Sequence, residues 1–241
     1  MPVDVGIAEQ RLDTREDGVR VVLPVLYRPQ RALLVYSSLM ESVVEVALRP
    51  VFMVSLHDRK EMAAVKALDC DYVQLYEGRR PGDYARKINL GAALTKEPWI
   101  FTAADDLHFE PGWAEKAIAC AETQGKHAMG VNDLGRWASR HKIPPAPHFL
   151  VARSYFERGT ADEPNAIFHT GYDHTYVDTE FMWTAQARGE YGYCQEAVVE
   201  HLHPVWRKGK RDEVYQLGAA KTRTDLRLFR QRERLWKTSR S

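Results

Sequence analysis

The sequence predicts an α/β fold in which helices flank a mostly parallel central sheet, and three observations support this prediction. Apolar, strand-like runs alternate with amphipathic helical patterns from Val19 onward, as they do in βαβ units. One such run, residues 99–102, leads directly towards the adjacent carboxylates of Asp105 and Asp106. The chain has 241 residues, of which 44% are hydrophobic and 28% charged, a globular composition that can bury one substantial core.

The first half of the chain alternates strands and helices regularly. The predicted elements are strands at 19–26, 51–54, 72–76 and 99–102 and helices at about 30–46, 60–68 and 83–95. The first helix is predicted because Leu33, Leu34, Leu39, Val43 and Val44 fall on one face. Open sheets of this kind bind ligands at the carboxyl edge of their parallel strands, so a site is expected where the strand at 99–102 ends.

The second half of the chain is less regular. Short strands are predicted at 129–133, 148–152 and 197–199. A helix is predicted at 176–189, with Asp178 and Glu180 near its start. The last strand leads into His201 and His203, whose side chains would share one face because alternate residues of a strand point the same way.

A basic tail follows residue 206. From Arg207 to Ser241 the chain carries twelve Lys and Arg residues against four Asp and Glu residues, so the rest of the chain is acidic. We predict a sheet domain at residues 1–206 and, at 207–241, a basic loop and helical tail that packs on the domain or extends from it. The cationic side chains of the tail either form a solvated face or bind nucleic acid, anionic lipid or a polyanionic acceptor.

The N-terminal sequence and the cysteines indicate in which cellular compartment the protein is expected. The N-terminal residues are charged without a long apolar run, and no stretch approaches the roughly 20 apolar residues that a membrane span needs. We therefore expect a cytoplasmic protein without a membrane span. Cys70, Cys120 and Cys194 are odd in number and widely separated, which favours reduced thiols over a disulfide framework or a cysteine zinc site.

Asp105 and Asp106 have two interpretations. Either residue could open a turn or cap the helix that follows Pro111 and Gly112. Alternatively, because adjacent carboxylates repel each other and are costly to bury together, the pair marks a place where a cation or a ligand's donors neutralise it. The position of the pair after an apolar strand favours the second interpretation.

Several motifs follow one another in a fixed order. They are an Asn-x-Gly pattern at 89–91 on a helix, Ala104-Asp105-Asp106 after a strand, Glu110-Pro111-Gly112-Trp113, Asp178 eleven residues before Gly189, and an apolar strand ending in His201. In this order, over residues 19–204, the chain resembles the family 2-type glycosyltransferases of the GT-A fold. In that family the Asn-x-Gly helix precedes the strand that bears the DxD-type metal motif.

The resemblance implies a divalent metal, Mn²⁺ or Mg²⁺, and a nucleotide-diphosphate sugar as co-substrate. A divalent cation held by carboxylates stabilises a departing diphosphate. Asp106 matches the direct metal ligand, and Asp105 matches the residue that contacts the donor's ribose or the metal's water shell. His201 matches a further ligand, and His203 and His108 are alternatives; histidines at a strand end are otherwise turn residues.

The resemblance also implies a set of donor-binding residues. Ser55 stands where the family usually has an Asp that reads the nucleotide base, and Asp58 follows three residues later, so the base is not predicted. Arg207 and Lys208 lie in a glycine-containing loop that could close on the diphosphate. The predicted donor-binding set is Pro24, Tyr27, Arg28, Ser55, Asp58, Lys87, Asn89, Ala104, Asp105, Arg207 and Lys208.

Asp178 matches the general base of an inverting transfer, with Glu180 as the fallback, although an Asp here could also be a helix N-terminal carboxylate. The sequence thus predicts a metal-dependent glycosyltransferase whose acceptor is unidentified (a glycan, protein, small molecule or modified nucleic acid). One alternative is a sugar-phosphate nucleotidyltransferase, although residues 24–29 lack the glycine-rich loop expected of that class. The other is a non-catalytic nucleic-acid-binding module that uses the basic tail. The oligomeric state is not predicted.

Overall fold

The computed structural model describes residues 6–13, 15–76, 82–135 and 145–237. The strands are β1 (Ile7–Arg11), β2 (Val19–Pro24), β3 (Leu48–Ser55), β4 (Asp71–Leu75), β5 (Trp99–Thr102), β6 (Leu107–Phe109), β7 (Ala128–Asn132), β8 (Phe149–Ala152) and β9 (Tyr191–His201). The helices are α1 (Pro29–Glu41), α2 (Arg59–Lys66), α3 (Asp83–Ala93), α4 (Trp113–Gln124), α5 (Arg153–Arg158), α6 (Val177–Ala187), α7 (Glu213–Ala219), α8 (Thr222–Arg232) and α9 (Arg234–Lys237), with a short 3-10 helix, η2 (Pro204–Trp206).

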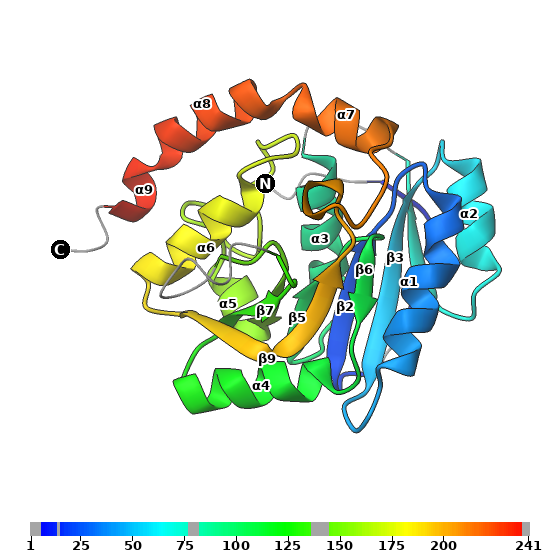
Figure 1. Ribbon diagram of the computed structural model, residues 1–241, viewed down its shortest axis with the longest axis horizontal. Coiled ribbons are helices and arrows are strands. Elements are labelled where there is room, and N and C mark those ends of the chain that lie inside the picture. The colour runs from blue at the N-terminus through cyan, green and yellow to red at the C-terminus, as the bar shows by residue number, and fades with distance from the viewer. Residues whose placement is uncertain (1–5, 14, 77–81, 136–144, 238–241) are drawn as a thin grey trace.

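These strands form one sheet in the order β1-β4-β3-β2-β5-β8-β7-β9-β6 (Figure 1). The four strands β4, β3, β2 and β5 are parallel to one another. The strands β8 and β6 and the edge strand β1 pair antiparallel with their neighbours. The predicted α/β fold with a mostly parallel central sheet is therefore confirmed.

Helices cover both faces of the sheet. Residues of β2 and β3 are buried along almost the whole of each strand, as expected for parallel strands with helices on both sides. On one face α1, α2 and α4 bury side chains such as Leu39, Val65 and Trp113. On the other face α3, α5 and α6 bury side chains such as Ile88 and Phe181.

The helix α1 differs from its prediction in length and in its buried face. It begins at Pro29, a residue suited to the first turn, and ends at Glu41 rather than near residue 46. Leu33 and Leu34 are exposed, and Val43 and Val44 are exposed beyond the end of the helix, so the predicted apolar face is wrong at these four positions. Leu39 is buried as predicted, together with Val35.

Two strands near the site were not predicted at their full extent. Residues 107–109 were not among the predicted strands, but they form β6, which pairs antiparallel with the end of β9. The strand β9 begins at Tyr191 and has eleven residues, whereas the sequence pattern predicted only residues 197–199. The strand β1, at the opposite edge of the sheet, was also not predicted.

The tail packs against the body of the molecule. Its helices α7, α8 and α9 follow one another in an arch that passes α6 (Figure 1), and Trp236 in α9 is only 2% exposed. Arg232 in α8 forms ion pairs with Asp162 and Glu180.

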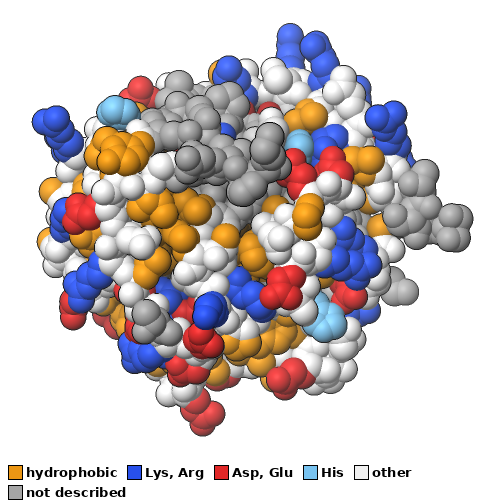
Figure 2. All heavy atoms as spheres, turned by 180° about the vertical axis from the view of Figure 1, so that it is seen from behind, with side chains coloured by type: hydrophobic (Ala, Val, Ile, Leu, Met, Phe, Trp, Pro, Cys, Tyr) orange, Lys and Arg blue, Asp and Glu red, His pale blue; other side chains and the backbone are white. Residues whose placement is uncertain are grey.

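On the opposite face of the molecule, Figure 2 shows cationic and anionic side chains interspersed with hydrophobic ones. No described helix is long and apolar enough to cross a membrane.

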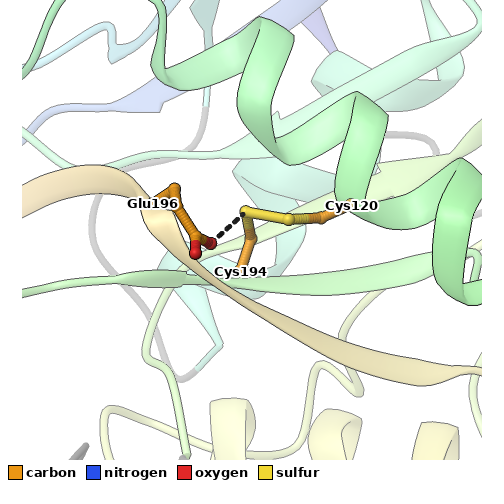
Figure 3. A group of neighbouring side chains, drawn as sticks. All are labelled: Cys120, Cys194 and Glu196. Carbon is orange, nitrogen blue, oxygen red and sulfur yellow. Dashed lines mark hydrogen bonds between the residues drawn. A yellow bond between two sulfur atoms is a disulfide. The ribbon is translucent and has the colours of Figure 1, made fainter.

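The cysteine prediction is wrong for two of the three residues. Cys120 on α4 and Cys194 on β9 form a disulfide with their Cα atoms 5.8 Å apart (Figure 3). The two residues are 74 positions apart in the sequence, and they meet because α4 packs against β9. Cys70 is a buried free thiol.

Candidate functional site

A cavity of about 490 Å³ opens at the carboxyl ends of β2 and β5. Its wall combines residues that are far apart in the sequence: the turn after β2, the Asp105–Asp106 pair, the segment 173–179, His201 and His203 at the end of β9 and just after it, and residues of α7. This is the edge of the parallel strands at which the sequence predicts a ligand.

Asp105 and Asp106 are both buried, at 7% and 5% exposure. Arg28 donates from Nη1 to Oδ1 of Asp105 over 2.9 Å. Oδ2 of Asp106 lies 3.2 Å from Nε2 of His201 and accepts a hydrogen bond from the hydroxyl of Tyr215. These carboxylates lie in the turn between β5 and β6 and are held by cationic and polar partners, and neither caps the following helix, because the N-cap of α4 is Gly112.

The pKa values of the two carboxyl groups are shifted in opposite directions. Burial, followed by the neighbouring charge of Asp106, raises the pKa of Asp105. Burial would also raise the pKa of Asp106, but the hydrogen bonds from His201 and Tyr215 outweigh it and hold that pKa well below its usual range. Asp106 is therefore the carboxylate that keeps its charge to the lower pH, which suits it to a cation.

The pairing of β6 with β9 brings His201 to Asp106. Leu107 is opposite His201 in this ladder, and the amide of Leu202 donates to the carbonyl oxygen of Asp106 over 2.8 Å. His203 also lines the cavity, and burial followed by the nearby His201 lowers its pKa to about 4. Both imidazoles thus lie on the same side of the site, as the His-x-His spacing predicts.

His108 does not join this group. It is exposed on β6, and its Nδ1 lies 3.0 Å from the hydroxyl oxygen of Ser38. A different histidine, His148, lines the cavity instead. Its Nδ1 lies 2.8 Å from the carbonyl oxygen of Thr102, and its buried Nε2 has no hydrogen-bond partner among the described residues. The sequence offered no signal for His148 beyond its position before a strand.

The donor atoms around Asp106 suit a divalent cation in type, since they are carboxylate oxygens and imidazole nitrogens. These atoms do not form a ready-made site with three protein ligands. Among the described residues, the group of three possible ligands with donor atoms within 4.8 Å of one another lies elsewhere and consists of Cys120, Cys194 and Glu196 (Figure 3). Those two cysteines are joined in a disulfide and offer no thiolate. A cation at Asp106 and His201 would take its remaining ligands from the substrate or water.

Asp178 lies at the second position of α6 and lines the same cavity. Its Oδ1 accepts hydrogen bonds from the amide and the hydroxyl of Thr179. Burial raises the pKa of Asp178, and the bonds from Thr179 partly offset this effect. Asp178 also borders a second cavity of about 400 Å³, whose wall includes Met182 and Trp206, so this residue lines both cavities.

Glu180 has a different environment from Asp178. It is 3% exposed, and its carboxylate accepts hydrogen bonds from the guanidinium of Arg232 at 2.8 to 3.1 Å. The hydroxyl of Tyr172 donates to the same carboxylate over 2.5 Å. Glu180 does not line the cavity, and its oxygens are occupied by structural partners.

Three of the residues predicted to bind the donor line the cavity in addition to Asp105: Pro24, Arg28 and Ala104. Tyr27 is 51% exposed with a φ of 56°, and its amide donates to Asp58 over 2.6 Å. Asp58 also caps α2 by accepting from the amide of Glu61, so both of its oxygens are used within the protein.

The other predicted donor residues lie outside this wall. Ser55 is buried, and its hydroxyl has no partner among the described residues. Lys87 is buried beside Asp83 and the carbonyl oxygen of Val25. The side chain of Asn89 binds the backbone of Ile167 and Phe168. Arg207 is exposed at a φ of 62°, and Lys208 pairs with Glu200 over 2.7 Å.

The tail supplies two site residues that the sequence did not predict. Asp212 accepts from Nη2 of Arg28 over 2.9 Å, and the Arg28 guanidinium lies 4.3 Å from the centre of the Tyr215 ring. Burial, followed by the charge of Asp106, raises the pKa of Tyr215, so its hydroxyl stays protonated and donates to Asp106. Tyr215 lies 109 positions from Asp106, and no local pattern predicts such a contact.

The chain has a GT-A glycosyltransferase fold, as comparison with solved structures shows. It is similar to the mannosyltransferase PcManGT from Pyrobaculum calidifontis (TM-score 0.59, 15% identity, covering 78% of this chain and 57% of that one). It is also similar to glucosyl-3-phosphoglycerate synthase from Mycobacterium tuberculosis (TM-score 0.58, 15% identity, 84% and 74%) and to residues 1–349 of TarS from S. aureus (TM-score 0.61, 12% identity, 76% and 59%).

The chain spans less than two thirds of the length of the mannosyltransferase and TarS chains that it matches. No protein-family model matches the sequence, and no curated relative matches it. These likenesses concern the fold, and the activity has to be argued from the residues of the site.

Proposed function

We propose that the protein is a metal-dependent glycosyltransferase that moves a sugar from a nucleotide diphosphate to an acceptor hydroxyl. The observation that carries this proposal is the buried pair Asp105 and Asp106, which lies at the carboxyl edge of the sheet and lines one cavity together with Asp178. Such a cavity offers both requirements of the reaction: a site for a cation and diphosphate, and a separate carboxylate for the acceptor's proton.

Asp106 and His201 are the proposed metal ligands, since their oxygen and nitrogen atoms already lie 3.2 Å apart. The bound cation would neutralise charge on the leaving diphosphate. Arg28, which is only 6% exposed, presents a guanidinium at the same place, and guanidinium groups match the geometry of phosphate oxygens. Asp105 orients this guanidinium through their ion pair.

Asp178 is the proposed general base of an inverting transfer. A base must lie within hydrogen-bond reach of the attacking hydroxyl, and Asp178 borders both the cavity with the Asp pair and the second cavity beside Met182 and Trp206. We assign the acceptor to this second cavity. Glu180 is not proposed as the base, because Arg232 and Tyr172 hold its carboxylate.

The solved structures of similar fold support the choice of ligands. The structure of the mannosyltransferase is a complex with GDP-mannose and Mn²⁺, that of glucosyl-3-phosphoglycerate synthase is a complex with Mn²⁺, UDP and phosphoglyceric acid, and that of TarS is a complex with UDP. We therefore propose Mn²⁺ or Mg²⁺ and a uridine or guanosine diphosphate sugar. A cytoplasmic location stays a prediction, and the Cys120–Cys194 disulfide counts against it because disulfides are rare in reducing compartments.

The proposal is tested by thermal unfolding with a panel of nucleoside diphosphates, each with and without Mn²⁺. A ligand at 100 times its Kd adds about 2.7 kcal/mol of stability, which raises the Tm of a chain of this size by about 5 to 11 °C. One diphosphate should give this shift only with the cation, and D106A should lose it. The matched control is D69A, which removes an exposed aspartate paired with Arg11 and should keep the shift. If no diphosphate shifts the Tm, or if D106A responds like the wild type, the proposal fails.

A further inference from the structure

The segment that precedes Asp178, residues 173–176, is not held in place by the hydrogen bonds of a helix or a strand. Asp173, His174, Thr175 and Tyr176 line the main cavity and belong to no helix or strand. Tyr176 is the N-cap residue of α6, where it has a left-handed backbone with a φ of 68° and makes no side-chain capping bond. A residue with a side chain rarely adopts this conformation, so contacts from elsewhere in the fold must hold it.

Asp225 in the first turn of α8 provides such contacts. Its carboxylate is 1% exposed and accepts hydrogen bonds from the amides of Asp173, His174 and Thr175 at 2.8 to 2.9 Å. The hydroxyl of Thr175 donates to it as well, over 3.1 Å. Three consecutive amides therefore converge on one carboxylate about fifty residues further along the chain, and bonds to a charged acceptor are among the stronger ones in proteins.

The rest of the tail packs on the same segment. The ring of Phe229 lies 5.2 Å from the ring of Tyr176, the residue with the left-handed backbone. A methyl group added to Gly218 would lie 2.3 Å from the ring of His174, so the backbone of α7 approaches that ring closely. Arg232, the last residue of α8, forms ion pairs with Asp162 and Glu180.

We propose that Asp225 is a positioning residue for the reaction. It holds residues 173–175 in the shape that directs α6, and with it the carboxylate of Asp178, towards the cavity. Asp225 does not line the cavity, so it acts through this segment and makes no contact with substrate. This inference rests on the proposed role of Asp178 as the base, and it makes the tail a part of the active site.

The test compares D225A and D225N with the control E233Q in the full-length protein. Glu233 lies at the end of the same helix and pairs with Lys237, so this control removes a tail carboxylate without touching residues 173–175. The first measurement is hydrogen exchange of the amides of residues 173–175. Exchange should accelerate by about tenfold or more in D225A, because these amides lose their acceptor, and should not change in E233Q.

The second measurement separates positioning from stability. In D225A the Tm shift given by nucleoside diphosphate and Mn²⁺ should equal that of the wild type. The kcat of sugar transfer should fall by about 10 to 100-fold, because a small misplacement of a catalytic group has an effect of this size. The donor KM should change by less than about twofold, since donor contacts are kept. The kcat of D225N should lie between those of the wild type and D225A, because the amide oxygen of Asn still accepts hydrogen bonds from some of the backbone amides of residues 173–175.

Unchanged exchange at residues 173–175 in D225A would overturn the inference, and so would accelerated exchange with a wild-type kcat. A loss of nucleotide binding in D225A that equals its loss of kcat would also overturn it, since the tail would then serve general stability. Failure of the proposed function would look different, because the wild-type protein itself would then neither bind a nucleoside diphosphate nor transfer sugar, whatever the exchange rates.

Discussion

Replacing Glu61 with Gln should stabilise the protein at pH 8 more than at pH 5. Glu61 lies in the first turn of α2 and is 0% exposed. One carboxylate oxygen accepts from the amide of Arg28 over 2.7 Å, and the other has no hydrogen-bond partner among the described residues. Burial raises the pKa of Glu61 to about 7 from its ordinary 4.5, although the bond from Arg28 partly offsets it.

The sign and the size of the effect follow from linkage. A folded-state pKa above the unfolded value means that the folded protein holds this proton more tightly, so stability is lost as the pH rises from about 4.5 to about 7. One pKa unit corresponds to about 1.4 kcal/mol, so the loss is about 1 kcal/mol at pH 5 and about 3 kcal/mol at pH 8. Gln cannot ionise, and its amide oxygen can keep the bond from Arg28.

The assay is denaturant unfolding of both proteins at pH 5 and at pH 8. The free-energy difference between E61Q and the wild type should shift by about 2 kcal/mol in favour of E61Q between these pH values. Any fixed cost of burying the new amide group cancels in this comparison. E41Q, at the exposed end of α1, is the control and should show the same difference at both pH values. An E61Q difference that does not change with pH would refute the reasoning.

Three further predictions concern the base, the tail and the disulfide. D178N should keep the Tm shift given by nucleotide and Mn²⁺ but lose about 100-fold or more in transfer rate, because binding and proton removal are separate tasks; a wild-type rate would exclude Asp178 as the base. E180A should lower the free energy of unfolding by about 1 to 3 kcal/mol, because the Arg232 guanidinium loses one of its two carboxylate partners and keeps only Asp162, and an unchanged free energy of unfolding would contradict this role. Reducing the bond between Cys120 and Cys194, which are 74 positions apart, should cost about 4 kcal/mol on the loop-entropy account; C120S should then be insensitive to reductant in the same unfolding assay.

Much of the N-terminal half was predictable because its signals are local. The strands β2, β3, β4 and β5 and the helices between them follow apolar patterns that one can read within a window of ten to fifteen residues. The position of Asp105 and Asp106 at the sheet edge follows from the same patterns, since parallel strands end together. The meeting of Asp178 and His201 with this pair in one cavity agrees with the order of motifs.

The parts that the sequence did not predict depend on contacts between distant segments. Tyr215 and Asp212 reach the site only because α7 folds back over it. Cysteine counting could not show that Cys120 and Cys194 are adjacent, because their proximity depends on how α4 packs on β9. Glu180 was a reasonable fallback base by position alone, and its pairing with a tail arginine removes it from that role.

The tail's position also changes the interpretation of its charge. Arg232 is only 9% exposed and is bound by two carboxylates, so it is not part of a solvated face or of a patch for nucleic acid. The tail's acidic residues Asp212 and Asp225 likewise bind the body of the molecule. Arg232 is therefore not available to the nucleic-acid-binding alternative, which would depend on the other cationic side chains of the tail.

The antiparallel pairing of β6 with the end of β9 has a consequence for synthesis. Asp106 leaves the ribosome long before His201, which reaches it through this ladder, and Tyr215 follows later still. The parallel strands β2 to β5 can pair while the chain is growing, and Asp105 can then already pair with Arg28, but Asp106 still lacks its histidine and tyrosine partners. A nascent chain arrested before residue 201 would present an unsatisfied Asp106 at the carboxyl end of β5, and nucleotide binding should appear only once the last helices have emerged.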